Sequence, residues 1–349
     1  MPFPYYEGRG QQREAVDLPA PIESLHDPRR YLADTGLRDA ANVALLLGRP
    51  LLLTGEPGTG KTDFAASLAW ELDFDPLLTF ETKSTSTARD LFYVYDTLGR
   101  FHAAHSGTGP RENREYIRYV ALGLAIIRAN QRNTVAEVLP EDFEHPGEPK
   151  RSVVLIDEVD KAPRDFPNDI LNELDRMYFR VPELGNVRLI ADPKLRPIVV
   201  VTSNSEKHLP DAFLRRCVYY DLPFPDAVRL RQIVEHRLGE LVGGSSPLLS
   251  DALEFFHQWL RTPTSGLRKK PSTAELLDWL IALRGAGADT DTFLHHNPTL
   301  AATTLSALVK GEDQQSGLTA LRAWVTSKAG AAPDDVRPVL EKWLQTTAR

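Results

Sequence analysis

The sequence of 349 residues contains one cysteine, Cys217, and two methionines. A single cysteine excludes an internal disulfide framework and a zinc site built from several thiolates. No hydrophobic run approaches the ~20 residues that a membrane-spanning helix needs, and the first residues lack the apolar core of a signal peptide. The nine histidines show no H-x-x-x-H or H-E-x-x-H spacing, which argues against a zinc site. We therefore expect a cytoplasmic protein without membrane insertion.

The sequence also lacks a basic excess. It has 41 Lys and Arg against 48 Asp and Glu, so its formal net charge is −7. Residues 50–110 alone carry eight acidic and four basic side chains. A protein that tracks nucleic acid or an anionic membrane needs the opposite sign on its working surface. The charge thus argues against a nucleic-acid partner and favours a protein client.

What is present has the composition of an ordinary globular chain, with 42% hydrophobic and 26% charged residues. Short apolar runs separated by helical spacing predict a doubly wound α/β domain, and only helical patterns follow Pro225. The predicted strands are 50–55, 77–80, 152–157 and 197–204. The predicted helices of this domain are 27–47, a segment after Gly60, 113–131 and 168–177, and a hairpin should turn at Gly185 and Asn186.

The strongest motif is GEPGTGKT, which lies directly after the run PLLL and before a helical pattern. This context is that of a P-loop, whose backbone N–H groups converge on phosphate oxygens. Glycines let the chain wrap closely, Lys61 places a charge on the β- and γ-phosphates, and the Thr62 hydroxyl is a hard ligand for Mg²⁺. The predicted nucleotide-binding residues are Gly55, Glu56, Pro57, Gly58, Thr59, Gly60, Lys61 and Thr62.

A second motif, VVLIDEVDKAP, places two acids at the end of a buried strand, where open α/β sheets bind ligands. Asp157 would hold magnesium, directly or through its waters. Glu158 would act as the general base that polarises the attacking water. Without the P-loop upstream, the same acids could equally cap the following helix.

Four motifs in this order, GEPGTGKT, IDEVDKAP, VVVTSNSE and LPDAFLRRCVYY, resemble the Walker A, Walker B, sensor 1 and arginine-finger elements of an AAA+ ATPase. Within that superfamily, residues 30–285 resemble the MoxR branch. The resemblance implies a P-loop AAA+ doubly wound parallel sheet with a C-terminal all-helical lid. The sequence pattern adds an arm at 1–29 and a helical extension at 286–349 on either side of an α/β domain at 30–223 and a lid at 224–285.

The resemblance also implies roles and partners. Asn204 would be sensor 1, which orients the lytic water, although it could simply end a strand. Arg216, with Arg215 as second choice, would be the arginine finger that a neighbouring subunit inserts; both could instead be solvated surface arginines. ATP and Mg²⁺ are the implied ligands. The implied assembly is a homo-oligomeric ring of six, acting as a chaperone on a protein client, with a von Willebrand factor A domain protein as the typical associate.

The sensor 2 position differs from the usual pattern of MoxR-like proteins. Where MoxR-like proteins carry a sensor 2 arginine, this sequence has Thr273 or Ala274, and Arg268, Lys269 or Lys270 could supply the cation. A capped helix start, with Ser272 and Glu275 in a capping box, is an equally good interpretation.

The segment at about 82–112 resembles the helix 2 insert of MoxR-like proteins. Its aromatic residues would either contact substrate or pack onto the domain: Phe92, Tyr93, Tyr95 and Phe101.

Three functions remain open from the sequence. The first is an ATP hydrolase that remodels or matures a protein partner. The second is a nucleic-acid motor of the McrB or clamp-loader kind, which the acidic balance disfavours. The third is a nucleotide-gated scaffold in a signalling or defence system, which the complete set of predicted catalytic residues disfavours.

Overall fold

The computed structural model describes residues 5–6, 8, 17–20, 22, 25–74, 76–105, 111–204, 209–330 and 332–347. Most of the predicted N-terminal arm at 1–29 lies outside the described residues. The chain divides into two compact units. One contains Ala33–Glu56 and Lys61–Pro223, and we call it the α/β unit. The other contains Phe224–Arg349 together with Met1–Leu32 and Pro57–Gly60, and we call it the helical unit.

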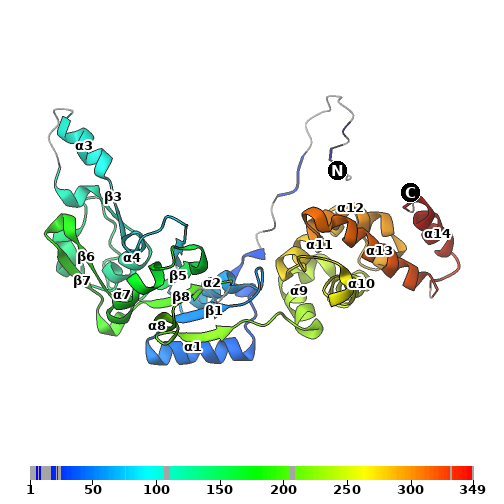
Figure 1. The fold of residues 1–349 in the computed structure, drawn as a ribbon, viewed down its shortest axis with the longest axis horizontal. Helices are drawn as coiled ribbons and strands as arrows, with labels where there is room; N and C mark the ends of the chain where they lie inside the picture. The colour runs from blue at the N-terminus through cyan, green and yellow to red at the C-terminus, as the bar shows by residue number, and fades with distance from the viewer. Residues whose placement is uncertain are drawn as a thin grey trace. The chain divides into compact units, whose positions relative to one another are not determined.

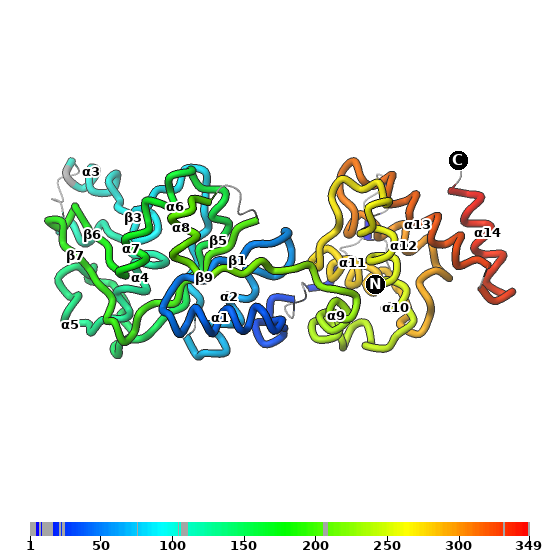
Figure 2. The backbone as a smooth tube through the Cα atoms, turned by 60° about the horizontal axis from the view of Figure 1, so that its bottom comes forward, coloured from blue at the N-terminus to red at the C-terminus, as the bar shows by residue number. Residues whose placement is uncertain are grey.

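A five-stranded parallel sheet with the order β2-β5-β8-β1-β9 forms the centre of the α/β unit (Figures 1 and 2). The predicted fold class is therefore confirmed. Leu155 of β5 is in register with Val200 of β8, which is in turn in register with Leu51 of β1. The strands are β1 Leu51–Thr54, β2 Leu78–Glu81, β5 Val153–Asp157, β8 Ile198–Thr202 and β9 Val218–Asp221.

The edge strand β9 is an addition to the four predicted strands. Its side chains are alternately half-buried and exposed, whereas β1 is buried at all four positions. A strand paired on one side only does not produce the continuous apolar run that marked the central strands. The pattern in front of the predicted domain boundary near Pro225 therefore gave no strand signal.

The helices of this unit partly match the prediction. Helix α1 begins at Thr35, not near residue 27, because the Asp34 carboxylate accepts a hydrogen bond from the backbone N of Leu37 at 2.9 Å and caps the first turn. It ends at Gly48, which has φ +61°. The helices are α1 Thr35–Leu47, α2 Lys61–Glu71, α3 Thr97–His105, α4 Ala121–Arg128, α5 Arg132–Val135, α6 Phe166–Asp169, α7 Leu171–Arg176 and α8 Asp211–Leu214.

The predicted helix at 113–131 is wrong in its first half. Strand β4 (Ile117–Tyr119) occupies that stretch and pairs antiparallel with β3 (Tyr93–Tyr95). The buried Ile117 and Tyr119 flank the exposed Arg118, which is the period of a strand. Helical spacing begins only with α4, whose side chains are almost all buried.

The region predicted as an insert, 82–112, contains β3 and α3, and its aromatic residues divide into two groups. Phe92 and Tyr93 are 4% and 1% exposed, and Phe92 stacks on Phe179 with ring centroids 5.2 Å apart. Phe101 on α3 is instead 58% exposed, and Figure 1 shows α3 extending away from the sheet. The aromatic residues near β3 therefore pack onto the domain, whereas α3 presents an apolar side chain to solvent.

The predicted hairpin is confirmed. Strands β6 (Tyr178–Val181) and β7 (Val187–Ile190) pair antiparallel. Gly185 and Asn186 both have positive φ, at +72° and +62°. Glycine and asparagine are the residues that adopt this conformation most readily.

The helical unit has no strand among its described residues. Its hydrophobic core contains Phe255, Trp279 and Trp324, and Trp343 at the edge of this core is 9% exposed. The predicted capping box of Ser272 and Glu275 is confirmed. The helices are α9 Ala227–Val242, α10 Pro247–Glu254, a π-helix at Phe255–Leu260, α11 Thr273–Gly285, α12 Pro298–Leu308, α13 Gln314–Ala329 and α14 Arg337–Thr346.

Candidate functional site

The loop between β1 and α2 has the backbone that the P-loop motif predicts. Gly55, Gly58 and Gly60 all have positive φ, at +133°, +73° and +92°. At Gly55 a Cβ atom would lie 2.5 Å from the carbonyl oxygen of Leu222, so only glycine fits there. Helix α2 begins at Lys61, so the unpaired N–H groups of its first turn follow directly on the loop.

The side chain of Lys61 is fixed against the backbone of this loop. Its side chain is only 7% exposed, and Nζ donates to the carbonyl oxygens of Gly55 and Glu56, both at 2.9 Å. Burial lowers the pKa of Lys61, while the carboxylates of Asp160 and Asp157 act against this shift. A positioned ammonium group beside a glycine-rich loop is a point charge for an anionic ligand.

Thr62 and Asp157 lie side by side. The Thr62 hydroxyl is 3.1 and 3.2 Å from the two carboxylate oxygens of Asp157. Among the described residues no cluster of three or more His, Cys, Asp and Glu side chains is arranged to hold a metal. Mg²⁺ does not need one, because it takes one or two protein oxygens and completes its octahedron with water and phosphate oxygens. A hydroxyl and a carboxylate at this spacing fit that requirement.

Thr202, which was not among the residues predicted from the sequence, contacts the Asp157 carboxylate and the backbone of Glu158. It ends β8, is 1% exposed, and its hydroxyl donates to Asp157 Oδ1 at 2.5 Å. Thr202 Oγ1 in turn accepts a hydrogen bond from the backbone N of Glu158 at 2.8 Å. The sequence could have predicted this role, because Thr202 lies in the motif VVVTSN at the carboxyl end of the strand next to β5.

Glu158 stands in a backbone conformation that is rare for a residue with a side chain. Its φ and ψ are +53° and +50°, and such strain is concentrated at functional sites. One carboxylate oxygen forms an ion pair with Lys161, and the other lies 3.5 Å from Asn204 Nδ2, which donates toward it. The predicted base and the predicted sensor are thus neighbours.

Asp160 anchors the segment that carries Asn204. Its Oδ1 accepts from the backbone N of Asn204 at 3.1 Å and from the Ser203 hydroxyl at 3.2 Å. The backbone N of Ser203 donates to Leu53 O at 2.9 Å, next to the start of the P-loop. Asp160 was visible as the third acid of VVLIDEVDKAP but was assigned no role.

Arg215 and Arg216 do not join this cluster. They lie between α8 and β9, and the register of Val218 with Leu51 places them at the amino end of the parallel strands. The P-loop, Asp157 and Asn204 all follow the carboxyl ends. Arg216 Nε forms an ion pair with Asp175 Oδ2 at 3.0 Å. Arg215 is exposed, and no ion pair joins its side chain to another described residue.

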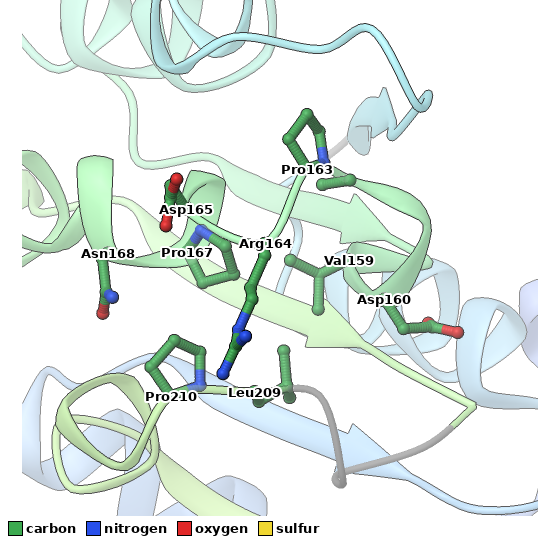
Figure 3. A pocket seen from close by; sticks show the side chains of 10 residues that line it. Val159, Asp160, Pro163, Arg164, Asp165, Pro167, Asn168, Leu209 and Pro210 are labelled. Atoms are coloured by element: carbon green, nitrogen blue, oxygen red, sulfur yellow. The ribbon is translucent and has the colours of Figure 1, made fainter.

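A pocket of about 710 Å³ lies beside the segment that follows β5 (Figure 3). Figure 3 shows the Arg164 side chain reaching between Leu209 and Pro210. Asp160 also lines it. The pocket therefore shares Asp160 with the cluster around Asn204, but its other lining residues are separate from the P-loop.

The residues considered for sensor 2 lie in the helical unit, where some of them are paired or buried and others are exposed. Arg268 forms an ion pair with Glu312, and the backbone N atoms of Arg268 and Lys269 donate to Asp313 at 3.1 and 2.9 Å. Thr273 is buried, at 7% exposure. Lys270 is exposed. The side chains of Lys269 and Lys270 are thus the candidates that remain without an ion pair among the described residues.

This sheet order, with a P-loop after β1 and two acids after β5, is that of an AAA+ ATPase. Residues 50–217 match the family described as AAA domain (dynein-related subfamily). The match covers just under half of the chain, and the matched segment includes the P-loop, Asp157, Asn204 and Arg216.

Solved structures are similar at low identity. A variant of Thermotoga maritima RuvB is 12% identical with a TM-score of 0.43, and the match covers 86% of this chain and 70% of that one. The FIGL-1 AAA domain in complex with ADP is 16% identical with a TM-score of 0.42, covering 84% and 88%. No curated protein sequence matches the chain. Within the part of the chain that the structure describes, no helix is both long and apolar enough to cross a membrane.

Proposed function

We propose that the chain hydrolyses ATP at the contacts between neighbouring copies in a homo-oligomeric ring and uses the energy to remodel a protein partner, as MoxR-like ATPases do. The observation that carries this proposal is the separation of Arg216 from the P-loop. The two lie beyond opposite ends of β1 and β9, about 13 Å of strand apart at 3.3 Å per residue. An arginine so placed cannot serve the P-loop of its own chain but is available to the next copy.

Each residue of the cluster would have one role. Backbone N–H groups of residues 55–62 and the Lys61 ammonium would bind the phosphates. Thr62 and Asp157 would hold Mg²⁺, which neutralises phosphate charge when bound. Glu158 would take the proton from the attacking water, and Asn204 would orient that water. Arg216 of the neighbouring copy would stabilise the charge that develops on the γ-phosphate.

The surface of α3 supports a protein partner. Leu98 and Phe101 are 66% and 58% exposed on a helix that none of the strands of the sheet covers. Exposed apolar side chains grouped on one element are typical of protein contacts. Nucleic-acid binding would instead need a basic stripe, and α3 has only Arg100 beside its two histidines. A partner with a von Willebrand factor A domain follows from the MoxR resemblance alone.

Assembly-dependent turnover tests the proposal. We expect the ATPase rate per chain to rise with protein concentration, and the mass in solution to increase when ATP is added. Lys61→Met removes a buried charge that two carbonyl groups hold in place, so ATP should bind about 100-fold more weakly. Titration of a fluorescent ATP analogue measures this, with Lys150→Met, at an exposed lysine, as the matched control.

Two outcomes would contradict the proposal. The first is a rate per chain that is independent of concentration, together with a monomeric mass in ATP. The second is ATPase stimulation by duplex or single-stranded DNA that declines steeply with salt, which would point to a nucleic-acid motor.

A further inference from the structure

Arg216 is paired with an acidic side chain of its own chain. Its guanidinium Nε pairs with Asp175 Oδ2 at 3.0 Å, and the two side chains are 42% and 40% exposed. An ion pair this exposed contributes little to stability, because water screens it. Any role of this ion pair therefore lies in the orientation of Arg216 and not in the stability of the fold.

We propose that Asp175 is the positioning residue of the arginine finger. It holds the Arg216 guanidinium by its Nε edge, so that the two terminal amino groups face the γ-phosphate of the ATP bound by the neighbouring copy. The inference rests on the proposed function, since it requires that Arg216 act on the next subunit.

The geometry of the guanidinium allows Nε to contact Asp175 while the two terminal nitrogens contact phosphate. The group is a rigid planar fork with five N–H donors. Nε is the guanidinium nitrogen that lies nearest to the Asp175 carboxylate, at 3.0 Å, and no side-chain hydrogen bond joins Arg216 to another described residue. Two parallel N–H groups are thus left for an end-on contact with phosphate oxygens, which is the arrangement arginine favours with that group.

Asp175 can position Arg216 only if it is itself fixed, and Arg196 fixes it. Arg196 Nη2 donates to the carbonyl oxygens of Leu174 and Asp175, at 3.0 and 3.1 Å. Arg196 Nε donates to Gly48 O at 2.9 Å, which ties the end of α7 to the end of α1. Burial lowers the pKa of Arg196, and the Asp175 carboxylate acts against this shift.

The segment that carries Arg216 is also packed against this carboxylate. Arg216 donates its backbone N to Phe213 O at 3.0 Å, and Phe213 is fully buried. Burial raises the pKa of the neighbouring Cys217 thiol to about 12, and Asp175 contributes to that shift. Both partners of the ion pair thus stand on backbone that is held in place, as a preorganised catalytic group requires.

Kinetics of Asp175 variants test the proposal in the full-length protein. Asp175→Ala should lower kcat for ATP about 10-fold through loss of alignment. KM for ATP and the ATP-dependent mass should stay at wild-type values, because neither binding nor assembly uses this carboxylate. Asp175→Glu should recover part of the loss. In an Arg216→Ala background, Asp175→Ala should cause no further loss. Asp169→Asn, at an exposed acid on α6, is the matched control.

The outcomes separate this inference from the proposed function. If Arg216→Ala is inactive but Asp175→Ala retains the wild-type kcat, the positioning role is wrong and the proposed function stands. A loss in Asp175→Ala that persists in the Arg216→Ala background, or that comes with a lower melting temperature, would show a merely structural role. If Arg216→Ala itself keeps full activity in an assembled ring, both proposals fail.

Discussion

Arg216→Ala is expected to lower kcat for ATP hydrolysis by about 1,000-fold, the lower end of what an arginine finger contributes. The guanidinium acts on charge that develops only in the transition state, so its removal should leave ATP affinity and ring assembly near their wild-type values. Steady-state turnover under conditions in which the mass shows an assembled ring measures the first quantity. Titration with an ATP analogue measures the second.

Arg215→Ala decides between the two arginines that the sequence left open. Arg215 is exposed, whereas Asp175 holds Arg216. We therefore expect Arg215→Ala to change kcat by no more than a few-fold. The assignment would be wrong if Arg216→Ala turned over ATP at the wild-type rate in an assembled ring, or if Arg215→Ala showed the larger loss.

Glu158→Gln is expected to lower kcat by about 100-fold or more, the range for loss of a general base. Glutamine keeps the shape of the side chain and can still accept from Asn204, but it cannot take a proton from water. ATP binding should be retained because the P-loop is unchanged, so the variant should trap ATP in an assembled ring. Single-turnover hydrolysis of prebound ATP, with size measured in parallel, tests both effects.

Asp165→Asn provides the control for charge on the same segment. Asp165 lies in the loop after β5 and is exposed, and it lines the pocket beside Asp160. It should therefore behave as wild type. Equal rates for Glu158→Gln and wild type would remove Glu158 from the role of base.

The central strands and the P-loop could be predicted from the sequence because their signals are local. A buried parallel strand is an apolar run, as in PLLL and VVLI, and a P-loop requires glycines at fixed positions. The predicted positions of β1, α2, β5 and β8 are confirmed to within a residue or two. The roles of Thr62, Asp157 and Glu158 followed from the P-loop motif and from the ligand-binding end of a parallel sheet, whereas that of Asn204 followed from the AAA+ resemblance.

The edge and insert strands could not be predicted in this way. Strand β9 alternates between half-buried and exposed side chains, which a short window cannot tell from a linker. Strand β4 precedes α4 directly, and the helical spacing of α4 was extended backward over it. The start of α1 was missed because Asp27 and Asp34 both cap helical turns; Asp27 caps only the 3-10 helix Pro28–Arg30, and the α-helix begins after Asp34.

The supporting residues of the site depended on tertiary contacts that no motif encodes. Thr202 joins Asp157 to the backbone of Glu158 across two strands. Asp175 and Arg216 are far apart in sequence and meet only because α7 ends beside the segment that precedes β9. The sequence distinguishes Arg216 from Arg215 only through alignment with a family pattern, whereas the structure gives one of them a partner.

The measurement that tests the account most directly mixes two inactive variants. Lys61→Met lacks a working P-loop but keeps Arg216, and Arg216→Ala has the reverse defect. If the site is completed between copies, random mixing at equal amounts gives about one contact in four with an intact P-loop facing an intact arginine. The mixture should then hydrolyse ATP well above the mean of the two separate variants. A mixture no more active than that mean, in rings shown to contain both variants, would contradict a site shared between neighbours.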